Sequence, residues 1–375
     1  MHHLSAHTLH SFFKNQLNEL YISMALRSFA FSLVDVFVPL YLLMQGYSLR
    51  SVFLFFVIVH AVHALCAFPA ARIALRIGFW FPVFVSSLLF ILFFFFLHTI
   101  GEYHWPLWLL GMVNGIANPL FWMAYHIDFV SCSDAEKRGQ EVGTIKIMNV
   151  AATAFAPALG AVIISLWGFP FLISVVSLIL GLSVLPLMFS TNRSGVSGSI
   201  RFSDIFHHQA VRASLNYFGH GIDQGLGVVW AIFIFLTISQ SLTVIGFASS
   251  IAIFCSFITL FFIGKLSNHH ARKVLSFGAT GTSLLWIVRL LYVNTPFLVY
   301  ITNALGGIFT SAVVVPFSVI VYGRSSDQQS CRPLITGEIL FHLGKVALFS
   351  LLALTPSFWG AFLSGALVPL VYFLF

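Results

Sequence analysis

Long apolar runs separated by short polar connections dominate the chain. Most runs hold about 20 residues, the length that an α-helix needs to cross the hydrocarbon core of a bilayer. They predict an all-α integral membrane protein with twelve spanning helices, at about residues 20–43, 51–70, 79–98, 105–127, 144–166, 169–189, 213–238, 241–263, 274–294, 297–321, 335–354 and 356–375. An outer-membrane barrel would instead show alternating segments of about ten residues.

The twelve runs fall into two groups of six, divided by the long polar segment at residues 190–212. We therefore expect four parts in the chain. They are a cytoplasmic tail at residues 1–19, a six-helix bundle at 20–189, a cytoplasmic linker at 190–212 and a second six-helix bundle at 213–375. Serine and glycine are frequent in the linker, as in flexible connections.

Sequence features recur in the two groups at nearly the same offset. The polar turn at residues 264–273 lies 193 positions after the turn at residues 71–80, and a Gly-Ile pair that begins at Gly115 recurs at Gly307. Such a spacing is typical of a parallel internal repeat. We therefore expect one six-helix unit to be present twice.

Composition and charge agree with a membrane protein and exclude a nucleic-acid partner. Only 8% of the 375 residues are charged, against about a quarter in soluble domains. The net charge is +7, but if both termini are cytoplasmic, thirteen Lys and Arg residues lie on that side and only Arg50 on the other. This asymmetry follows the positive-inside rule. It predicts a protein of the plasma or bacterial inner membrane with both termini in the cytoplasm.

The two polar turns resemble the signature G-x-x-x-D-R-x-G-R-R of the major facilitator superfamily, found between the second and third helix of each half. The later turn has Asn268 at the aspartate position, and the earlier turn has Leu75 there. Asp128 ends the fourth span, where family members have an acid that pairs with the turn, so we expect it to pair with Arg72 or Arg76. The resemblance implies a gating motif formed by Arg72, Arg76, Gly78, Asp128, Gly264, Asn268, Arg272 and Lys273.

Two further segments resemble motifs of the same family. Residues 152–161, ATAFAPALGA, are similar to the exporter motif G-x-x-x-G-P-x-x-G-G and keep Pro157 and Gly160. Residues 111–122 are similar to the fourth-helix motif R-x-x-Q-G-x-G, with Gly111 at the arginine position. The first resemblance implies a helix bend and favours export, as in the twelve-helix drug:proton antiporters.

Ionisable and polar side chains inside the predicted spans are the candidate site. A charged side chain is costly in a bilayer, so we expect these groups to face a cavity or one another. The expected cavity residues are Arg27, Asp35, Asn118, Trp122, His220, Asp223, Glu338, His342 and Lys345. Asp223 and Glu338 are the groups expected to change protonation, and Asp223 is expected to pair with Arg27 or Lys345.

The eleventh span carries the most specific polar pattern. Glu338, His342 and Lys345 follow each other at i, i+4 and i+7, which places all three on one helix face. This stripe suits a water-filled path or a proton relay, and a static ion-paired ladder is the alternative. Arg289 lies near the outer end of the ninth span, where we expect it to extend to the membrane surface.

His60 and His63 in the second span also share a helix face. No cysteine or carboxylate completes a set of metal ligands with them, so we interpret them as hydrogen-bonded packing groups. We expect no metal and no cofactor. An enzyme is not expected either, because the sequence shows no nucleophile with a neighbouring base.

The resemblance and the cavity residues together imply a secondary transporter, a monomer embedded in lipid. Its two halves would rock around a central site and move a small organic solute coupled to protons. Export by antiport is favoured. Proton-coupled nutrient uptake by symport and a non-transporting scaffold or sensor are the alternatives.

Overall fold

The computed structural model describes residues 16–132, 147–188, 211–324 and 332–374, and within these ranges all regular structure is helical. The expected tail and the expected linker therefore lie largely outside the described residues. The elements are α2 (Gln16–Val34), η1 (Asp35–Phe37), α3 (Val38–Met44), α4 (Leu49–Ile77), α5 (Trp80–His98), α6 (Ile100–Tyr103), α7 (Leu107–Cys132), α9 (Ala156–Met188), α10 (Val211–Phe233), η3 (Ile234–Ile238), α11 (Leu242–Tyr292), α12 (Pro296–Arg324), α13 (Arg332–Leu354), α14 (Phe358–Leu367) and η4 (Val368–Leu374).

The described helices agree with the predicted number of crossings. Ten helical stretches among the described residues are long and apolar enough to span a bilayer. One of them, Ile147–Pro186, is interrupted by Gly168, whose φ of +82° breaks the helix and returns the chain across the molecule. The last apolar helix, Phe358–Phe373, is shorter. With that division and this last helix, the described residues provide twelve apolar helical segments, the number of crossings predicted.

The polar turns predicted between neighbouring spans are turns in the structure. Gly78 ends α4 with a φ of +88°, a backbone conformation that favours glycine. Its N–H donates to the Ala74 carbonyl oxygen at 2.9 Å. In the second half, the break inside α11 falls at His270. The surroundings of Gly264 and the side chain of Asn268 lie outside what the structure describes.

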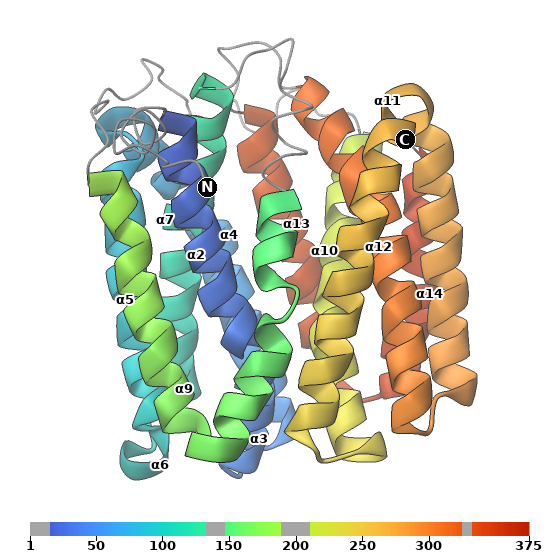
Figure 1. Ribbon diagram of the computed structural model, residues 1–375, viewed down its shortest axis with the longest axis horizontal. Coiled ribbons are helices and arrows are strands. Elements are labelled where there is room, and N and C mark those ends of the chain that lie inside the picture. The colour runs from blue at the N-terminus through green and yellow to red at the C-terminus, as the bar shows by residue number, and fades with distance from the viewer. Residues whose placement is uncertain (1–15, 133–146, 189–210, 325–331, 375) are drawn as a thin grey trace, which may run out of the picture.

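The helices lie side by side and run up and down the molecule (Figure 1). Helices before residue 189 occupy one side of this view and those after residue 210 the other. Two helix pairs join these sides, because α4 packs on α13 and α9 packs on α11. The division into bundles at 20–189 and 213–375 stays a prediction, but these two contacts are where two such halves meet.

One close helix contact occurs twice, at positions related by the repeat. A Cβ atom at Gly115 would lie 2.7 Å from the carbonyl oxygen of Val59, and a Cβ at Gly307 would overlap that of Ala252. The paired positions differ by 192 and 193 residues. Small residues allow this approach of two backbones. The contact supports the expectation of a duplicated unit.

The Pro157 motif lies at a break in the fifth crossing. Ala154 and Phe155 form a turn that interrupts the helix just before Pro157. The N–H of Ala158 donates to the Ser250 hydroxyl on α11 at 2.9 Å, which satisfies a backbone group that the break releases. Gly160 then presses against the Leu33 carbonyl of α2. The motif is a bend held between α2 and α11.

An apolar cluster joins the two sides of the molecule. Phe349 of α13 stacks on Phe56 of α4, with ring centroids 5.0 Å apart, and on Phe53 at 6.3 Å. Tyr41 of α3 lies 4.3 Å from the Phe169 ring of α9. Within a bilayer such contacts stabilise by dispersion and close packing. The Phe349 contacts lie between the two sides, whereas the contact of Tyr41 with Phe169 lies within the first.

Two glycines of α10, one tightly packed and one in open space, provide a matched test of the helix packing. A Cβ at Gly221 would overlap the Phe341 carbonyl of α13, whereas a Cβ at Gly227 meets nothing within 4 Å. We expect Gly221→Ala to lower the free energy of unfolding by roughly 1–3 kcal/mol through overpacking. Gly227→Ala should leave it unchanged or raise it by up to about 1 kcal/mol. Thermal unfolding midpoints of the detergent-solubilised variants measure this, and equal midpoints would contradict the described α10–α13 contact.

Candidate functional site

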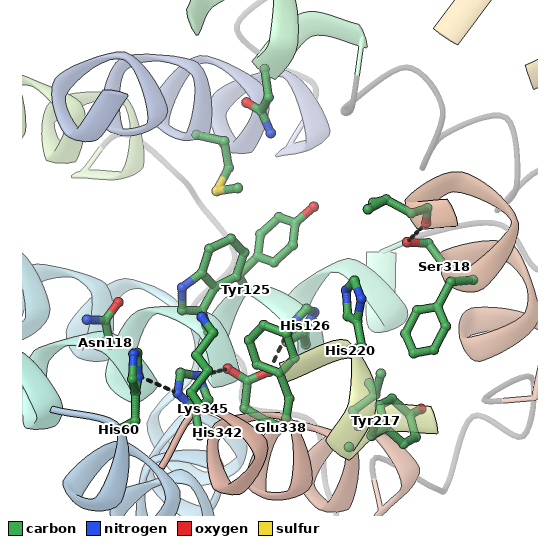
Figure 2. Close-up of a pocket in the computed structure, with 18 residues that line it drawn as sticks. His60, Asn118, Tyr125, His126, Tyr217, His220, Ser318, Glu338, His342 and Lys345 are labelled. Atoms are coloured by element: carbon green, nitrogen blue, oxygen red, sulfur yellow. Dashed lines mark hydrogen bonds and ion pairs between the residues drawn. The ribbon is translucent and has the colours of Figure 1, made fainter. Parts of the chain in front are cut away.

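Two adjoining cavities lie between the helices. The central cavity, about 550 Å³, is lined by residues of α2, α4, α5, α7, α9, α10, α11 and α13, and η1 contributes Asp35. The entrance cavity, about 500 Å³, is lined near the ends of α7, α10, α12 and α13, and Figure 2 shows its side chains. Both volumes are within the usual range for small-molecule sites. Five residues line both cavities: Met24, His60, Asn118, Trp122 and Lys345.

Arg27 of α2 is fixed in the wall of the central cavity. Its guanidinium donates to Ser86 Oγ at 3.0 Å and to Ser87 Oγ at 3.2 Å, both on α5. Each serine hydroxyl donates its own hydrogen to a backbone carbonyl, at 2.7 Å and 3.0 Å, so the oxygen is left to accept from arginine. The guanidinium carbon also lies 3.9 Å from the Phe121 ring centroid. Arg27 is thus a buried cation held in the cavity wall, and its role in binding a substrate stays a prediction.

Asp35 faces the same cavity from the 3₁₀ turn η1. Its side chain is exposed within the cavity, whereas the neighbouring Val34 and Phe37 are buried. Arg27 and Lys345 are the two cations that interact electrostatically with its carboxylate. An acid and two cations therefore converge on one space, although they come from η1, α2 and α13.

Asn118 and Trp122 lie on α7 between the two cavities. The Asn118 amide donates to Asn114 Oδ1 at 2.7 Å, which fixes its orientation one helical turn from Asn114. The Trp122 indole stacks near His126, with ring centroids 5.8 Å apart. Both predicted residues line both cavities.

The predicted stripe on α13 faces the entrance cavity as one row. Glu338, His342 and Lys345 all line it. Nε2 of His342 lies 3.3 Å from Glu338 Oε1, and the Lys345 ammonium lies 4.4 Å from the Phe341 ring centroid. The shared face predicted from the i, i+4, i+7 spacing is observed.

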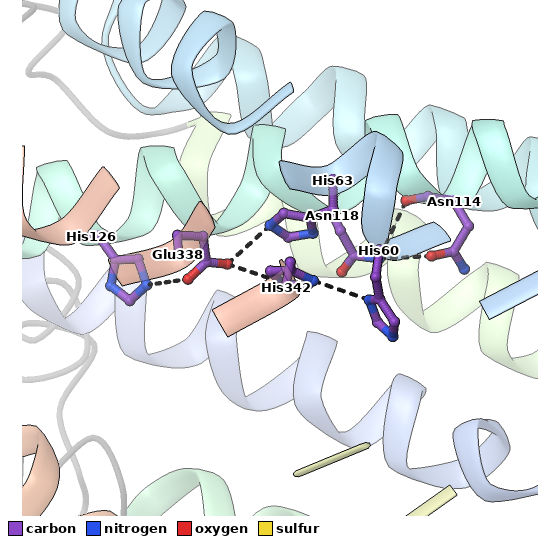
Figure 3. Close-up of polar contacts among 7 residues, drawn as sticks. All are labelled: His60, His63, Asn114, Asn118, His126, Glu338 and His342. Atoms are coloured by element: carbon purple, nitrogen blue, oxygen red, sulfur yellow. Dashed lines mark hydrogen bonds and ion pairs between the residues drawn. The ribbon is translucent and has the colours of Figure 1, made fainter. Parts of the chain in front are cut away.

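Three histidines of the first half converge on this row (Figure 3). His63 Nε2 of α4 lies 3.0 Å from Glu338 Oε1, and His126 Nε2 of α7 lies 4.0 Å from Oε2. His60 Nδ1 lies 3.0 Å from Nδ1 of His342. The sequence gives a weak signal for His60 and His63, which share a helix face, and none that links His126 to them.

His220 and Asp223 lie apart from this cluster. His220 lines the entrance cavity, and its Nδ1 lies 2.7 Å from the Tyr372 hydroxyl oxygen. Asp223 lines neither of the two cavities. Its electrostatic partner is Arg289, and it also interacts with Tyr372. Among the described residues the expected pairing of Asp223 with Arg27 or Lys345 is therefore not formed.

The expectation that Arg289 extends to the membrane surface is wrong. The side chain is 8% exposed, and its guanidinium carbon lies 4.5 Å from the Trp230 ring centroid and 4.7 Å from that of Trp286. It donates to Asn303 Oδ1 at 3.1 Å, an oxygen that also accepts from the Trp230 indole at 2.7 Å. Two tryptophans, an asparagine and a nearby acid thus provide partners for this cation inside the protein.

The expected gating residues lie at the helix ends. Arg72, Arg76, Arg272 and Lys273 are exposed, and the Arg72 guanidinium lies 5.6 Å from the Phe68 ring centroid. Asp128 is half-buried near the end of α7. Its pairing with Arg72 or Arg76 stays a prediction.

Replacing Arg289 tests whether it stabilises the second half. We expect Arg289→Ala to lower the free energy of unfolding by about 3 kcal/mol, because it removes the contacts to two tryptophans and leaves Asp223 without its cation. Arg289→Lys should lose less, since it keeps the charge but not the planar stacking. Arg50→Ala, at an exposed arginine, is the control in thermal unfolding. A midpoint for Arg289→Ala equal to that of the control would contradict the interpretation.

Comparison with known proteins identifies the fold. No protein-family model and no curated protein sequence matches the chain. Among solved structures, the chain is similar to the human organic anion transporter MFSD10 (TETRAN), with a TM-score of 0.70 and 13% identity. The match covers 96% of this chain and 99% of that one. The protein therefore has the fold of a major facilitator superfamily transporter.

Proposed function

We propose that this protein is a secondary transporter that moves a small organic solute across the membrane by alternating access. The central cavity carries the proposal. It lies between helices of both halves, is about 550 Å³ and presents Arg27, Asp35 and Lys345. Ionisable groups inside a membrane protein are costly and are typical of substrate or ion pathways. The likeness to a transporter over nearly the whole chain supports the same reading.

The packing around the cavities supports one end being closed and the other open. The contacts of Phe349 with Phe53 and Phe56 join the halves by apolar surface, and these rings can separate without leaving a buried charge unpaired. The polar side chains of the entrance cavity lie toward the ends of α7, α10 and α13. Rocking of the halves would exchange which end is closed.

The lining favours an organic anion with an apolar body. Two cations, Arg27 and Lys345, face one acid, Asp35. Aromatic rings cover much of the remaining wall: Phe31, Phe55, Phe56, Phe90, Phe93, Phe94, Phe121 and Trp122. A carboxylate or sulfonate would bind the cations, and the rings would hold a flat apolar group. The similar human protein is named as an organic anion transporter.

Asp35 is the best-placed group for coupling to protons. It is exposed in the cavity between two cations, so a bound anion would compete with its carboxylate for Arg27 and Lys345. Taking up a proton at Asp35 would release both cations to the anion. A proton and an anion that bind together cross in the same direction, so this step favours symport. The bend at Pro157 and Gly160, which is similar to the exporter motif, is the feature that favours export.

Flux through proteoliposomes tests the function. Purified protein is reconstituted with an imposed pH gradient, and uptake of labelled organic anions, zwitterions and cations is measured with a pH-sensitive dye inside the vesicles. We expect accumulation of an anion together with movement of protons. The direction of proton movement relative to the anion separates antiport from symport. Absence of flux for every solute, from protein that unfolds cooperatively, would favour a non-transporting scaffold.

Replacing Asp35 tests the coupling. In Asp35→Asn we expect accumulation driven by the pH gradient to be lost, because an amide neither takes up nor releases a proton in this pH range. Exchange of labelled for unlabelled solute at equal pH should remain within about threefold. Glu102→Gln, the same change at an exposed acid, should keep both activities. Gradient-driven accumulation by Asp35→Asn at the level of the control would remove Asp35 from the mechanism.

Replacing Arg27 tests the substrate class. Arg27→Gln removes a charge-assisted hydrogen bond to an anion, worth about 1.5–3 kcal/mol. We expect the half-saturation concentration for an anion to rise by at least about tenfold, which corresponds to about 1.4 kcal/mol. Half-saturation for a neutral analogue of the same solute should change little. Equal changes for the anion and the neutral analogue would show that Arg27 does not recognise the charge.

A further inference from the structure

We propose that a divalent transition-metal ion of the zinc type binds between α4 and α13, held by His63 Nε2, Glu338 Oε1 and His342 Nε2. Donor atoms of these three residues lie within 4.8 Å of one another. The two histidines come from different halves of the chain, and the carboxylate lies one helical turn from His342. No carboxylate lies near His63 in the sequence, but the fold brings Glu338 of α13 next to it.

The distances fit a metal as well as they fit an ion pair. The Glu338 oxygen lies 3.0 Å from His63 Nε2 and 3.3 Å from His342 Nε2. Zinc binds imidazole nitrogen and carboxylate oxygen at about 2.0–2.2 Å. Two ligands at such distances in a tetrahedral arrangement lie about 3.3 Å apart. One ion could contact all three atoms once the stacked imidazole rings rotate apart, so that their in-plane lone pairs point to the same place.

His63 is the observation that favours a metal over a hydrogen-bonded cluster. The residue is fully buried, and neither of its ring nitrogens makes a hydrogen bond of good geometry within the described part of the chain, although Nε2 is at ion-pair distance from Glu338. A buried polar nitrogen without a partner is costly. A metal ion would bind Nε2 through its lone pair and would need no aligned hydrogen, whereas Nδ1 would still need a partner.

The packing of the two imidazoles suits the neutral form that binds metals. The His63 and His342 rings stack with centroids 3.4 Å apart and an interplanar angle of 16°. Two imidazolium cations at this separation would repel each other, so at least one ring is neutral. A neutral imidazole nitrogen is a common metal ligand.

The surrounding residues complete the site. His60 Nδ1 lies 3.0 Å from the other ring nitrogen of His342, as expected of a residue that orients a metal-binding histidine. His126 Nε2 lies 4.0 Å from the second Glu338 oxygen, where it could orient the carboxylate or move in as a fourth ligand. Glu338, His342, His60 and His126 all line the entrance cavity, which gives an ion a route to the site.

The ligand set selects the kind of metal. Two imidazoles and one carboxylate, with a fourth position open, suit Zn²⁺ and its tetrahedral substitute Co²⁺. Mg²⁺ and Ca²⁺ prefer oxygen ligands and would bind poorly. Because the ligands come from α4 and α13, a bound ion would also link the two halves across the interface described above. This linkage would hold that interface closed while the ion stays bound.

Binding of Co²⁺ and Zn²⁺ to the purified full-length protein, without an affinity tag, tests the site. The reference protein carries alanine at the histidines of the N-terminal segment and of residues 190–212, which would otherwise bind metal: His2, His3, His7, His10, His207 and His208. We expect one Co²⁺ per protein, with the visible absorption of a tetrahedral site that one equivalent of Zn²⁺ abolishes. Zn²⁺ should also raise the thermal unfolding midpoint.

Variants decide whether the named residues hold the ion. In the reference protein, His63→Ala and Glu338→Gln should each lower the Co²⁺ affinity by at least about 100-fold and abolish the stabilisation by Zn²⁺. His98→Ala, at an exposed histidine, should change neither. His63→Cys should restore binding and add a thiolate-to-cobalt absorption band. Affinity in His63→Ala equal to the reference, or an unaltered spectrum in His63→Cys, would overturn the proposal, and neither result depends on transport activity.

Discussion

The cost of placing an ionised or polar group in an apolar bilayer organises this structure. Arg27 is held by two serine hydroxyls and an aromatic ring, and Arg289 by two tryptophans and an asparagine. Glu338 gathers histidines from three helices. Each of these groups turns inward because lipid offers no partner, and the cavities lie where several of them meet. The fold and the candidate site thus follow from one constraint.

Properties that depend on local spacing could be predicted from the sequence. The lengths of the apolar runs give the crossings, and the i, i+4, i+7 spacing of Glu338, His342 and Lys345 gives a shared helix face that the structure confirms. Gly78 was expected at a turn and has the positive φ that a turn requires there. These predictions hold because helix geometry alone fixes them.

Contacts between helices distant in the chain could not be predicted. His60 and His342 are 282 residues apart, so nothing in the sequence pairs them. His63 was interpreted as a packing residue because its carboxylate partner lies on α13. Arg289 was placed at the membrane surface from its depth alone, although Trp230 and Trp286 provide an interior site. Depth along a helix is readable from sequence, whereas the direction in which a side chain points depends on its neighbours.

The shared wall of the two cavities links their occupancy by bound molecules. Met24, His60, Asn118, Trp122 and Lys345 each face both spaces. A molecule that draws Lys345 or Trp122 toward one space removes part of the boundary of the other. Two bound molecules could therefore not occupy the two spaces independently, because each would change the wall of the space that holds the other.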